Sequence, residues 1–312
     1  MEYLLLLTGF IILIASGKYL VKSSVSIALR YKVSRLVIGL TVVAFGTSAP
    51  ELFVSVTAAI ENHPGISVGN VVGSNIVNIA LVLALTAVIF PITLKRKSVV
   101  YDWAFMMFSS ILFYLFILDG FIQFFEGVTF VLLLCGYITI SINLSRKRQL
   151  LEDILIEPPA YSPAIAIFVV LISSAGLAFG SDLLVKNAVI IAEKFHINER
   201  VISITLIAFG TSVPELATSV IAALKKEMDI SIGNIVGSNI FNILGVLGIT
   251  ALIKKIEIPP ATISFDIYWV LGVAILLFLF LLPFNPGKLT RLKGVILFAV
   301  YCLYVYLLFI KM

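Results

Sequence analysis

The sequence contains few charged residues for its length. Of its 312 residues only 12% are Asp, Glu, Lys or Arg, whereas 61% are hydrophobic and the mean hydropathy is +1.14. A soluble domain carries about a quarter charged residues, which it needs to cover its surface. The shortage of charge excludes a soluble globular protein and a disordered chain, and it leaves an integral membrane protein.

Cysteine is scarce as well. Cys135 and Cys302 are the only two, and each lies in an apolar run. They form neither a disulfide framework nor a metal motif, which excludes a secreted disulfide-rich scaffold. The net charge of +5 comes from short basic clusters between apolar runs, a pattern typical of membrane topology rather than of a nucleic-acid-binding face. We expect contact with the lipid bilayer, no nucleic acid, no cofactor and no obligate protein partner.

Long apolar runs predict an all-α membrane protein, because strands of a membrane β-barrel would alternate apolar and polar residues. A spanning helix needs about 20 apolar residues. The sequence predicts ten such helices, of which the first and sixth are over-long and expected to tilt. The ten ranges are 3–29, 36–60, 66–90, 100–118, 122–144, 163–192, 201–224, 230–253, 266–284 and 292–310.

Lys and Arg residues predict the orientation of the chain. With the N-terminus outside, roughly 14 of them fall in inside loops and about 5 outside, which is the bias that cytoplasmic loops show. The even number of spans then places the C-terminus outside too. The compact form indicates the plasma membrane of a prokaryotic cell.

An internal repeat divides the chain. Thr41–Ile79 aligns with Thr205–Ile243 without a gap at an offset of 164, and roughly 24 of 39 positions are identical. The sequence therefore predicts a first five-helix repeat at 1–144 (signature 39–90), a cytoplasmic linker at 145–162 and a second repeat at 163–312 (signature 203–253). Since each half has an odd number of spans, the second repeat enters the membrane from the opposite side, an architecture found in secondary transporters.

Each repeat places the motif GTSxPE near the middle of a span. Pro50 and Pro214 remove a backbone donor and are predicted to break their helices. Broken backbone is tolerated at this depth where it is buried in protein or lines a cavity, and carbonyls near Ala44 are expected to face one.

Glu51 and Glu215 are the residues most indicative of function. A buried carboxylate within the bilayer costs several kcal/mol unless it is neutralised, and no Lys, Arg or His lies near either one in its own span. Hydroxyls three and four residues earlier share the helix face with each acid, and hard oxygen donors of this kind suit Na⁺ and Ca²⁺. These hydroxyls belong to Thr47, Ser48, Thr211 and Ser212.

The third and eighth spans carry the motif GNxxGSN, whose polar side chains share one helix face. We expect four of them to line the cavity, namely Ser74, Asn78, Ser238 and Asn242. The glycines of the same motif are spaced four apart and permit close approach of helices. They are Gly69, Gly73, Gly233 and Gly237.

These motifs, the ten spans and the short linker resemble the calcium/cation antiporter superfamily, and most of all its prokaryotic sodium/calcium exchangers. The resemblance implies a core of spans two, three, seven and eight, with spans one and six as a mobile pair. It implies that the glutamates, hydroxyls and amides named above are ion ligands, together with the main-chain oxygens of Ala44 and Ala208. Several archaeal and potassium-dependent relatives carry Asp where this chain has Asn242, whereas potassium-independent animal sodium/calcium exchangers carry Asn there. The resemblance therefore implies no potassium requirement.

The charge of the site indicates a mechanism. Two ionised glutamates give the empty site a charge of about −2, which is costly to expose to the apolar interior while the site changes sides. One Ca²⁺ or several Na⁺ cancel that charge, which favours obligate exchange by alternating access over a leak. The resemblance implies three Na⁺ per Ca²⁺ and hence electrogenic transport.

Three alternatives remain open from sequence. In a proton/calcium exchanger the glutamate pair would titrate instead of binding Na⁺. A passive cation channel could also be lined by glutamates, although two mirror-related sites suit alternating access better than a pore. An intramembrane hydrolase would need two acids poised at different pKa values to activate water.

Overall fold

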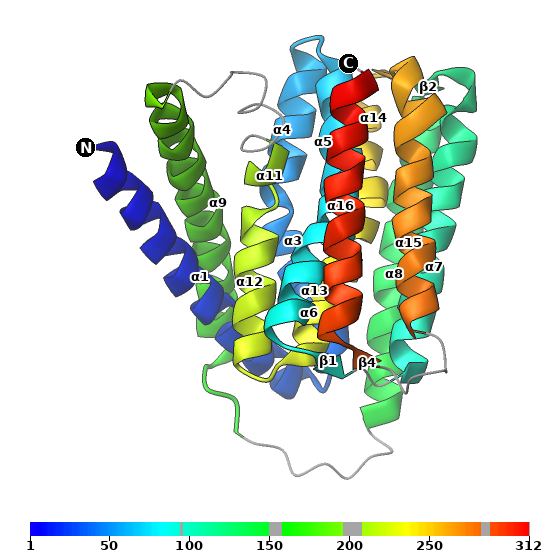
Figure 1. Ribbon diagram of the computed structural model, residues 1–312. Helices are drawn as coiled ribbons and strands as arrows, with labels where there is room; N and C mark the ends of the chain where they lie inside the picture. Colours follow the sequence, from blue (N-terminus) through cyan, green and yellow to red (C-terminus); the bar gives the residue numbers. More distant parts are fainter. Residues whose placement is uncertain (94–95, 150–157, 196–207, 282–287, 312) are drawn as a thin grey trace. The chain divides into compact units, whose positions relative to one another are not determined.

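The computed structural model describes residues 1–93, 96–149, 158–195, 208–281 and 288–311, and most of them are helical (Figure 1). The chain forms two compact units. Unit 1 comprises Met1–Ala49 and Ile140–Asn234, and unit 2 comprises Pro50–Thr139 and Ile235–Met312. Each unit therefore takes residues from both halves of the sequence.

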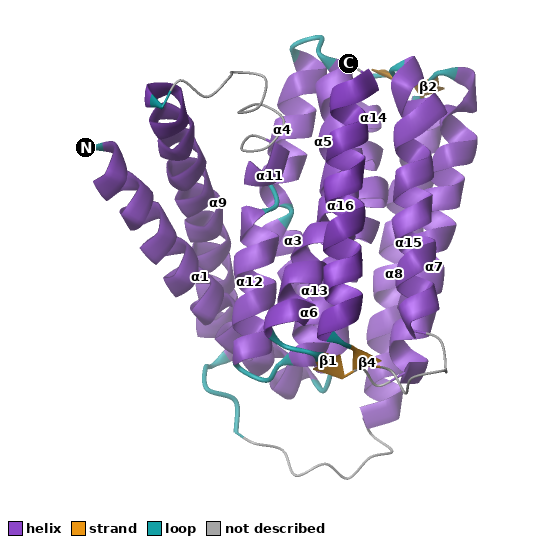
Figure 2. Cartoon of the chain, viewed as in Figure 1, coloured by secondary structure: helices purple, strands orange, loops and turns teal. Residues whose placement is uncertain are grey.

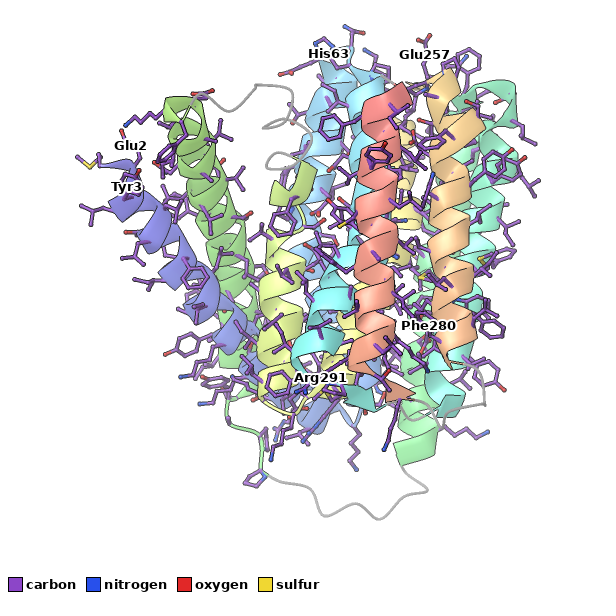
Figure 3. All side chains as sticks on the ribbon, viewed as in Figure 1. Glu2, Tyr3, His63, Glu257, Phe280 and Arg291 are labelled. Atoms are coloured by element: carbon purple, nitrogen blue, oxygen red, sulfur yellow. The ribbon has the colours of Figure 1, made fainter. Side chains whose placement is uncertain are left out.

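Two long helices dominate unit 1. They are α1 (Glu2–Tyr31) and α9 (Pro163–Lys194), and they lie side by side (Figure 1). A Cβ on Gly9 would lie 2.8 Å from the main-chain oxygen of Gly180, so the two backbones are in contact. Glu2, labelled in Figure 3, pairs with Lys194 at 3.0 Å. The start of α1 thus meets the end of α9, and the first and sixth spans run in opposite directions.

Short helices complete unit 1. They are α2 (Arg35–Ile38), the π-helical segment η1 (Gly39–Val43), α3 (Ala44–Thr47), α11 (Ala208–Gly210) and α12 (Val213–Leu224). The unit also includes the end of α8 (Phe124–Gln149) and the start of α13 (Met228–Ile240).

Segments predicted to be inside loops meet at one end of unit 1. The Ser34 N–H donates to Oγ of Ser145 at 2.7 Å, and Ser34 also caps α2 by accepting the N–H of Val37. Arg35 Nη1 lies 2.9 Å from both carboxylate oxygens of Glu227. The first inside loop, the end of α8 and the α12–α13 turn therefore share one side, as the predicted topology requires.

Unit 2 contains the remaining helices. They are α4 (Ala49–Ile60) from Pro50 onward, α5 (Pro64–Val77), η2 (Asn78–Leu83), α6 (Ala84–Ile89), α7 (Arg96–Phe116), η3 (Ile117–Asp119), most of α8, the end of α13, η5 (Phe241–Leu247), α14 (Gly248–Ile253), η6 (Thr262–Asp266), α15 (Ile267–Leu281) and α16 (Arg291–Lys311).

Two short antiparallel strand pairs close the ends of unit 2. β1 (Ile92–Thr93) pairs with β4 (Lys288–Leu289) at one end, and β2 (Phe121–Ile122) pairs with β3 (Ile256–Glu257) at the other (Figure 2). His63 and Glu257 lie at the β2–β3 end (Figure 3). β1 follows α6 whereas β3 follows α14, so the third and eighth spans run in opposite directions through the unit. Inverted repeats require this arrangement.

Among the described residues, eight helices are each long and apolar enough to span a membrane. Arg35–Thr47 and Ala49–Ile60 together form a ninth candidate span as a bent pair. Large apolar side chains such as Phe10 on α1 and Phe168 on α9 are exposed, as expected of surfaces that contact lipid. The predicted seventh span, 201–224, lies partly outside the described residues, and its described part contains α11 and α12.

One repeated contact extends beyond the signatures and was not predicted. The Tyr137 hydroxyl donates to Oδ1 of Asp102 at 2.9 Å, and the Tyr304 hydroxyl lies 3.4 Å from Oδ1 of Asp266. Asp102 and Asp266 are separated by the same offset of 164 as the signatures. Each repeat thus ties its fourth span to its fifth through an Asp–Tyr hydrogen bond within unit 2.

The domain boundaries expected from the sequence, at 144 and 163, stay a prediction.

Candidate functional site

The first signature breaks its helix where the sequence predicted. α3 ends at Thr47, Ser48 leaves the helical conformation with φ −90° and ψ 8°, and α4 begins at Ala49. Pro50 explains the break because it supplies no N–H to the carbonyl of Gly46, four residues earlier. The Ala44 carbonyl, by contrast, accepts the Ser48 N–H at 2.9 Å, and the Thr47 hydroxyl lies 3.3 Å from the same oxygen.

The second signature breaks in the same way. α11 ends at Gly210, Ser212 has φ −89° and ψ 4°, and α12 begins at Val213. Pro214 deprives the Gly210 carbonyl of its helical donor, and the hydroxyl of Ser181 on α9 replaces that donor at 2.6 Å. Ser181 has no counterpart in the first repeat, where the equivalent position on α1 is Gly17. The sixth span therefore donates a side-chain hydrogen bond to the broken seventh span, and Gly17 has no side chain to make the equivalent bond from the first span.

In unit 1 the two signatures meet directly. The hydroxyl of Ser48 donates to Oε1 of Glu215 at 2.9 Å, and both side chains are completely buried. The hydroxyl of Thr47 donates to Oδ1 of Asn234 at 3.0 Å. Residues that lie 164 or more positions apart in the chain thus form one buried polar cluster around the second glutamate.

Asn234 fixes the backbone of that cluster. Its Nδ2 donates to the main-chain oxygen of Glu215 at 3.4 Å and to Oγ of Ser219 at 3.0 Å, and Ser231 donates to the Ser219 carbonyl. One amide therefore holds α12 against α13 while its oxygen orients the hydroxyl of Thr47.

Unit 2 repeats this arrangement around the first glutamate. Glu51 is completely buried on α4, and Nδ2 of Asn70 donates to its main-chain oxygen at 3.1 Å and to Oγ of Ser55 at 3.0 Å. Asn70 and Ser55 correspond to Asn234 and Ser219 at the offset of 164. Sequence reasoning missed these four residues. For Asn70 and Asn234 the sequence does carry a signal, because the first Asn of GNxxGSN is identical in both copies.

Four asparagines from α5–η2 and α13–η5 meet in unit 2. Asn78 Nδ2 donates to Oδ1 of Asn239, and Asn242 Nδ2 donates to Oδ1 of Asn75, both at 3.1 Å. Asn75 and Asn239 each donate their own Nδ2 to the main-chain oxygen of the other at 3.3 Å. The contacts are identical with the repeats exchanged, which indicates a local two-fold relationship between them.

This network leaves ligand atoms available. The Oδ1 atoms of Asn78 and Asn242 are buried and have no hydrogen-bond partner among the described residues. Ser74, Ser238 and Ser212 are also buried. Thr211 is half-buried, and Ala208 is the first residue of α11. A buried oxygen without a donor costs free energy, so the retention of the Oδ1 atoms of Asn78 and Asn242 points to a ligand.

π-helical segments adjoin these asparagines. η2 begins at Asn78, and η5 begins one residue before Asn242. π-helical turns inside α-helices are frequently found at functional sites. Both repeats therefore place the same irregularity beside the same amide.

Comparison with known proteins decides the family. The sodium/calcium exchanger protein family matches residues 1–143 and 165–310. The chain belongs to this family. The exchanger is 39% identical to CaxA of Alkalimonas amylolytica over 97% of each chain. It is 30% identical to the sodium/calcium exchanger MaX1 of Methanosarcina acetivorans, over 99% of this chain and 98% of that relative.

A solved structure confirms the fold. The exchanger superposes on the sodium-calcium exchanger NCX_Mj with a TM-score of 0.82 and 31% identity, over 98% of this chain and 97% of that one. The predicted fold class, an all-α membrane protein of ten helices in two inverted repeats, is thereby confirmed. The exchanger is a multi-pass cation/Ca²⁺ antiporter rather than an enzyme.

Proposed function

We propose that this chain exchanges Na⁺ for Ca²⁺ by alternating access. The observation that supports it best is the completely buried carboxylate of Glu215, which accepts a hydrogen bond from Ser48 of the other signature. A carboxylate buried among hydroxyl and amide oxygens suits a hard cation, since Ca²⁺ takes six to eight oxygen ligands. The relatives MaX1 and NCX_Mj are both named as sodium/calcium exchangers.

The proposed ligands come from both signatures and both GNxxGSN motifs. Glu51 and Glu215 supply the charge, while neutral oxygens complete the coordination. The neutral ligands are the side chains of Thr47, Ser48, Ser74, Asn78, Thr211, Ser212, Ser238 and Asn242, with the main-chain oxygens of Ala44 and Ala208. A site charge of about −2 is balanced by one Ca²⁺ or by several Na⁺, so a loaded site crosses the apolar interior at lower cost than an empty one.

A flux measurement tests the choice of counter-ion. We expect ⁴⁵Ca²⁺ uptake into proteoliposomes loaded with Na⁺ to require an outward Na⁺ gradient, and to be accelerated by unlabelled Ca²⁺ inside. Exchange of three internal Na⁺ for one external Ca²⁺ would move one net positive charge out of the vesicle. An inside-positive potential set with valinomycin should therefore increase uptake, because it adds about 2.3 kcal/mol to the driving force per 100 mV. In a separate series without valinomycin, replacing external K⁺ with choline should leave ⁴⁵Ca²⁺ uptake unchanged. The reason is that Asn242 stands where potassium-dependent relatives carry a carboxylate.

Two outcomes would contradict this proposal. Uptake that follows a pH gradient and ignores Na⁺ would identify a proton/calcium exchanger. Uptake that internal Ca²⁺ does not accelerate, and that continues without any counter-ion, would identify a channel. Protein-free liposomes carried through the same gradients provide the background.

We further propose that both termini face the outside of the cell membrane. Roughly 14 of the Lys and Arg residues fall in the loops assigned to the inside and about 5 in those assigned to the outside, and cytoplasmic loops carry such an excess. At that end of unit 1, Nζ of Lys225 donates to the main-chain oxygen of Lys18, and burial together with Lys18 and Lys22 lowers the pKa of Lys225.

Cysteine labelling checks the orientation. In a background with Cys135 and Cys302 replaced by Ala, a cysteine at the exposed His63 should react with an impermeant maleimide in intact cells. A cysteine at Lys226 should react only after the membrane is permeabilised. The reverse pattern would show that the chain is inserted with its termini inside.

A further inference from the structure

The four asparagines of unit 2 belong to two classes. Asn78 and Asn242 are proposed ion ligands, whereas Asn75 and Asn239 have no assigned role. The amides of Asn75 and Asn239 are nearly completely buried, and each contacts the main chain and the ligand amide of the opposite repeat. Their hydrogen bonds determine how the ligand amides are turned.

The orientation follows from a main-chain oxygen, which can only accept. Asn75 lies 3.3 Å from the main-chain oxygen of Asn239, so the atom that faces it must be Nδ2. Oδ1 of Asn75 then faces Asn242 and can only accept, which requires Nδ2 of Asn242 on that side at 3.1 Å. The Oδ1 atom of Asn242 is consequently turned away from the network, where no donor among the described residues reaches it.

The same sequence of constraints operates in the other repeat. Asn239 donates to the main-chain oxygen of Asn75, accepts from Nδ2 of Asn78, and leaves Oδ1 of Asn78 without a donor. An amide presents either an oxygen, which attracts a cation, or an NH₂ group, which repels one. The two ends are almost equal in size, so packing alone does not select between them.

We infer that Asn75 and Asn239 are positioning residues that hold the ligand amides of Asn242 and Asn78 with their oxygens toward the cation. The inference rests on the proposed function, because it assigns these two residues to the same ion site. A carboxylate ligand needs no such partner, since both of its ends are oxygen. An exchanger with amides at 78 and 242 therefore requires orienting residues that one with aspartate at these positions does not.

A double-mutant comparison tests this role. Asn75→Ala should weaken Ca²⁺ binding about tenfold, the loss expected when an oriented hydrogen bond beside a charged ligand is removed. In an Asn242→Asp background the same Asn75→Ala substitution should leave Ca²⁺ affinity unchanged or raise it, because the carboxylate presents oxygen in either orientation. Ca²⁺ binding is measured by isothermal titration on the purified full chain in detergent, with the thermal unfolding midpoint recorded for each variant.

Ser109→Ala is the matched control. Its hydroxyl is buried in α7 and, among the described residues, bonds only the Phe105 carbonyl of its own helix, so its removal should not change Ca²⁺ affinity in either background. If Asn75→Ala does not fold, Asn239→Ala with and without Asn78→Asp repeats the test in the other half.

The outcomes separate this inference from the proposed function. An equal loss of affinity in the Asn242 and Asp backgrounds would mean that Asn75 acts through packing, and it would overturn the positioning role while Ca²⁺ binding stands. Absence of Ca²⁺ binding by the unaltered chain would overturn the proposed function, and the positioning role with it. If Asn75→Ala lowers Ca²⁺ affinity when residue 242 is Asn but not when it is Asp, the result would support both the positioning role and the proposed function.

Discussion

Glu215→Gln is expected to abolish Na⁺-driven ⁴⁵Ca²⁺ uptake, and Glu51→Gln is expected to do the same. Each substitution preserves the size of the side chain but removes one of the two negative charges that we propose balance Ca²⁺. Removing one partner of a buried ionic interaction costs about 3 to 5 kcal/mol, which corresponds to a fall of at least about 100-fold in affinity. Uptake into proteoliposomes under an outward Na⁺ gradient measures the loss.

The hydrogen bond from Ser48 distinguishes a local defect from unfolding. Ser48 can donate to the amide oxygen of Gln as it does to the carboxylate of Glu215, so Glu215→Gln should retain the thermal unfolding midpoint measured without Ca²⁺. Glu61→Gln is the matched control, because Glu61 is exposed at the end of α4 and should transport normally when neutralised. Full uptake by either buried variant would show that the glutamates do not bind the transported ion.

Gly233→Ala should prevent unit 1 from forming its observed packing. A Cβ at this position would lie 2.5 Å from the main-chain oxygen of Leu36 and 3.0 Å from the main-chain nitrogen of Leu40. Backbone atoms cannot rotate aside as a side chain can, so α13 would have to move away from η1. Overpacking of this kind costs about 1 to 3 kcal/mol or more. We expect a thermal midpoint lower by several degrees and a smaller yield of monodisperse protein.

Gly272→Ala controls for the substitution itself. Gly272 lies in the interior of α15, and a Cβ there would meet no described atom within 4 Å. Since Ala favours a helix over Gly by up to about 1 kcal/mol, this variant should be as stable as the unaltered chain or slightly more so. Equal midpoints for Gly233→Ala and the unaltered chain would contradict the close contact between α13 and η1.

The spacing of small residues along a helix predicts close approach of another helix at some glycines but not at others. The sequence indicated close helix approach for Gly69, Gly73, Gly233 and Gly237. The structure confirms this for Gly233, which touches the backbone of α2 and η1, whereas Gly69 and Gly73 have no described neighbour within 4 Å of an added Cβ. Identical motifs differ here because a contact depends on the facing helix, which the spacing does not describe.

The sequence by itself determined the number and kind of most elements. Apolar runs of about 20 residues can be stable in lipid only as helices, because the bilayer offers no partner to an unpaired backbone group. Pro50 and Pro214 determined where two of these helices break, since a missing N–H acts through its own chain. The offset of 164 and the odd number of spans per repeat determined that the halves are inverted, which follows from counting alone.

Only the tertiary structure decided which polar atoms meet. The bond from Ser48 to Glu215, the donation of Ser181 to the Gly210 carbonyl and the exchange between Asn75 and Asn239 join distant segments of the chain. Spacing along a helix predicts which side chains share a face, but a hydrogen bond also needs a partner on another helix at the correct height and angle. That position depends on how the helix backbones pack, and packing is a property of the whole fold.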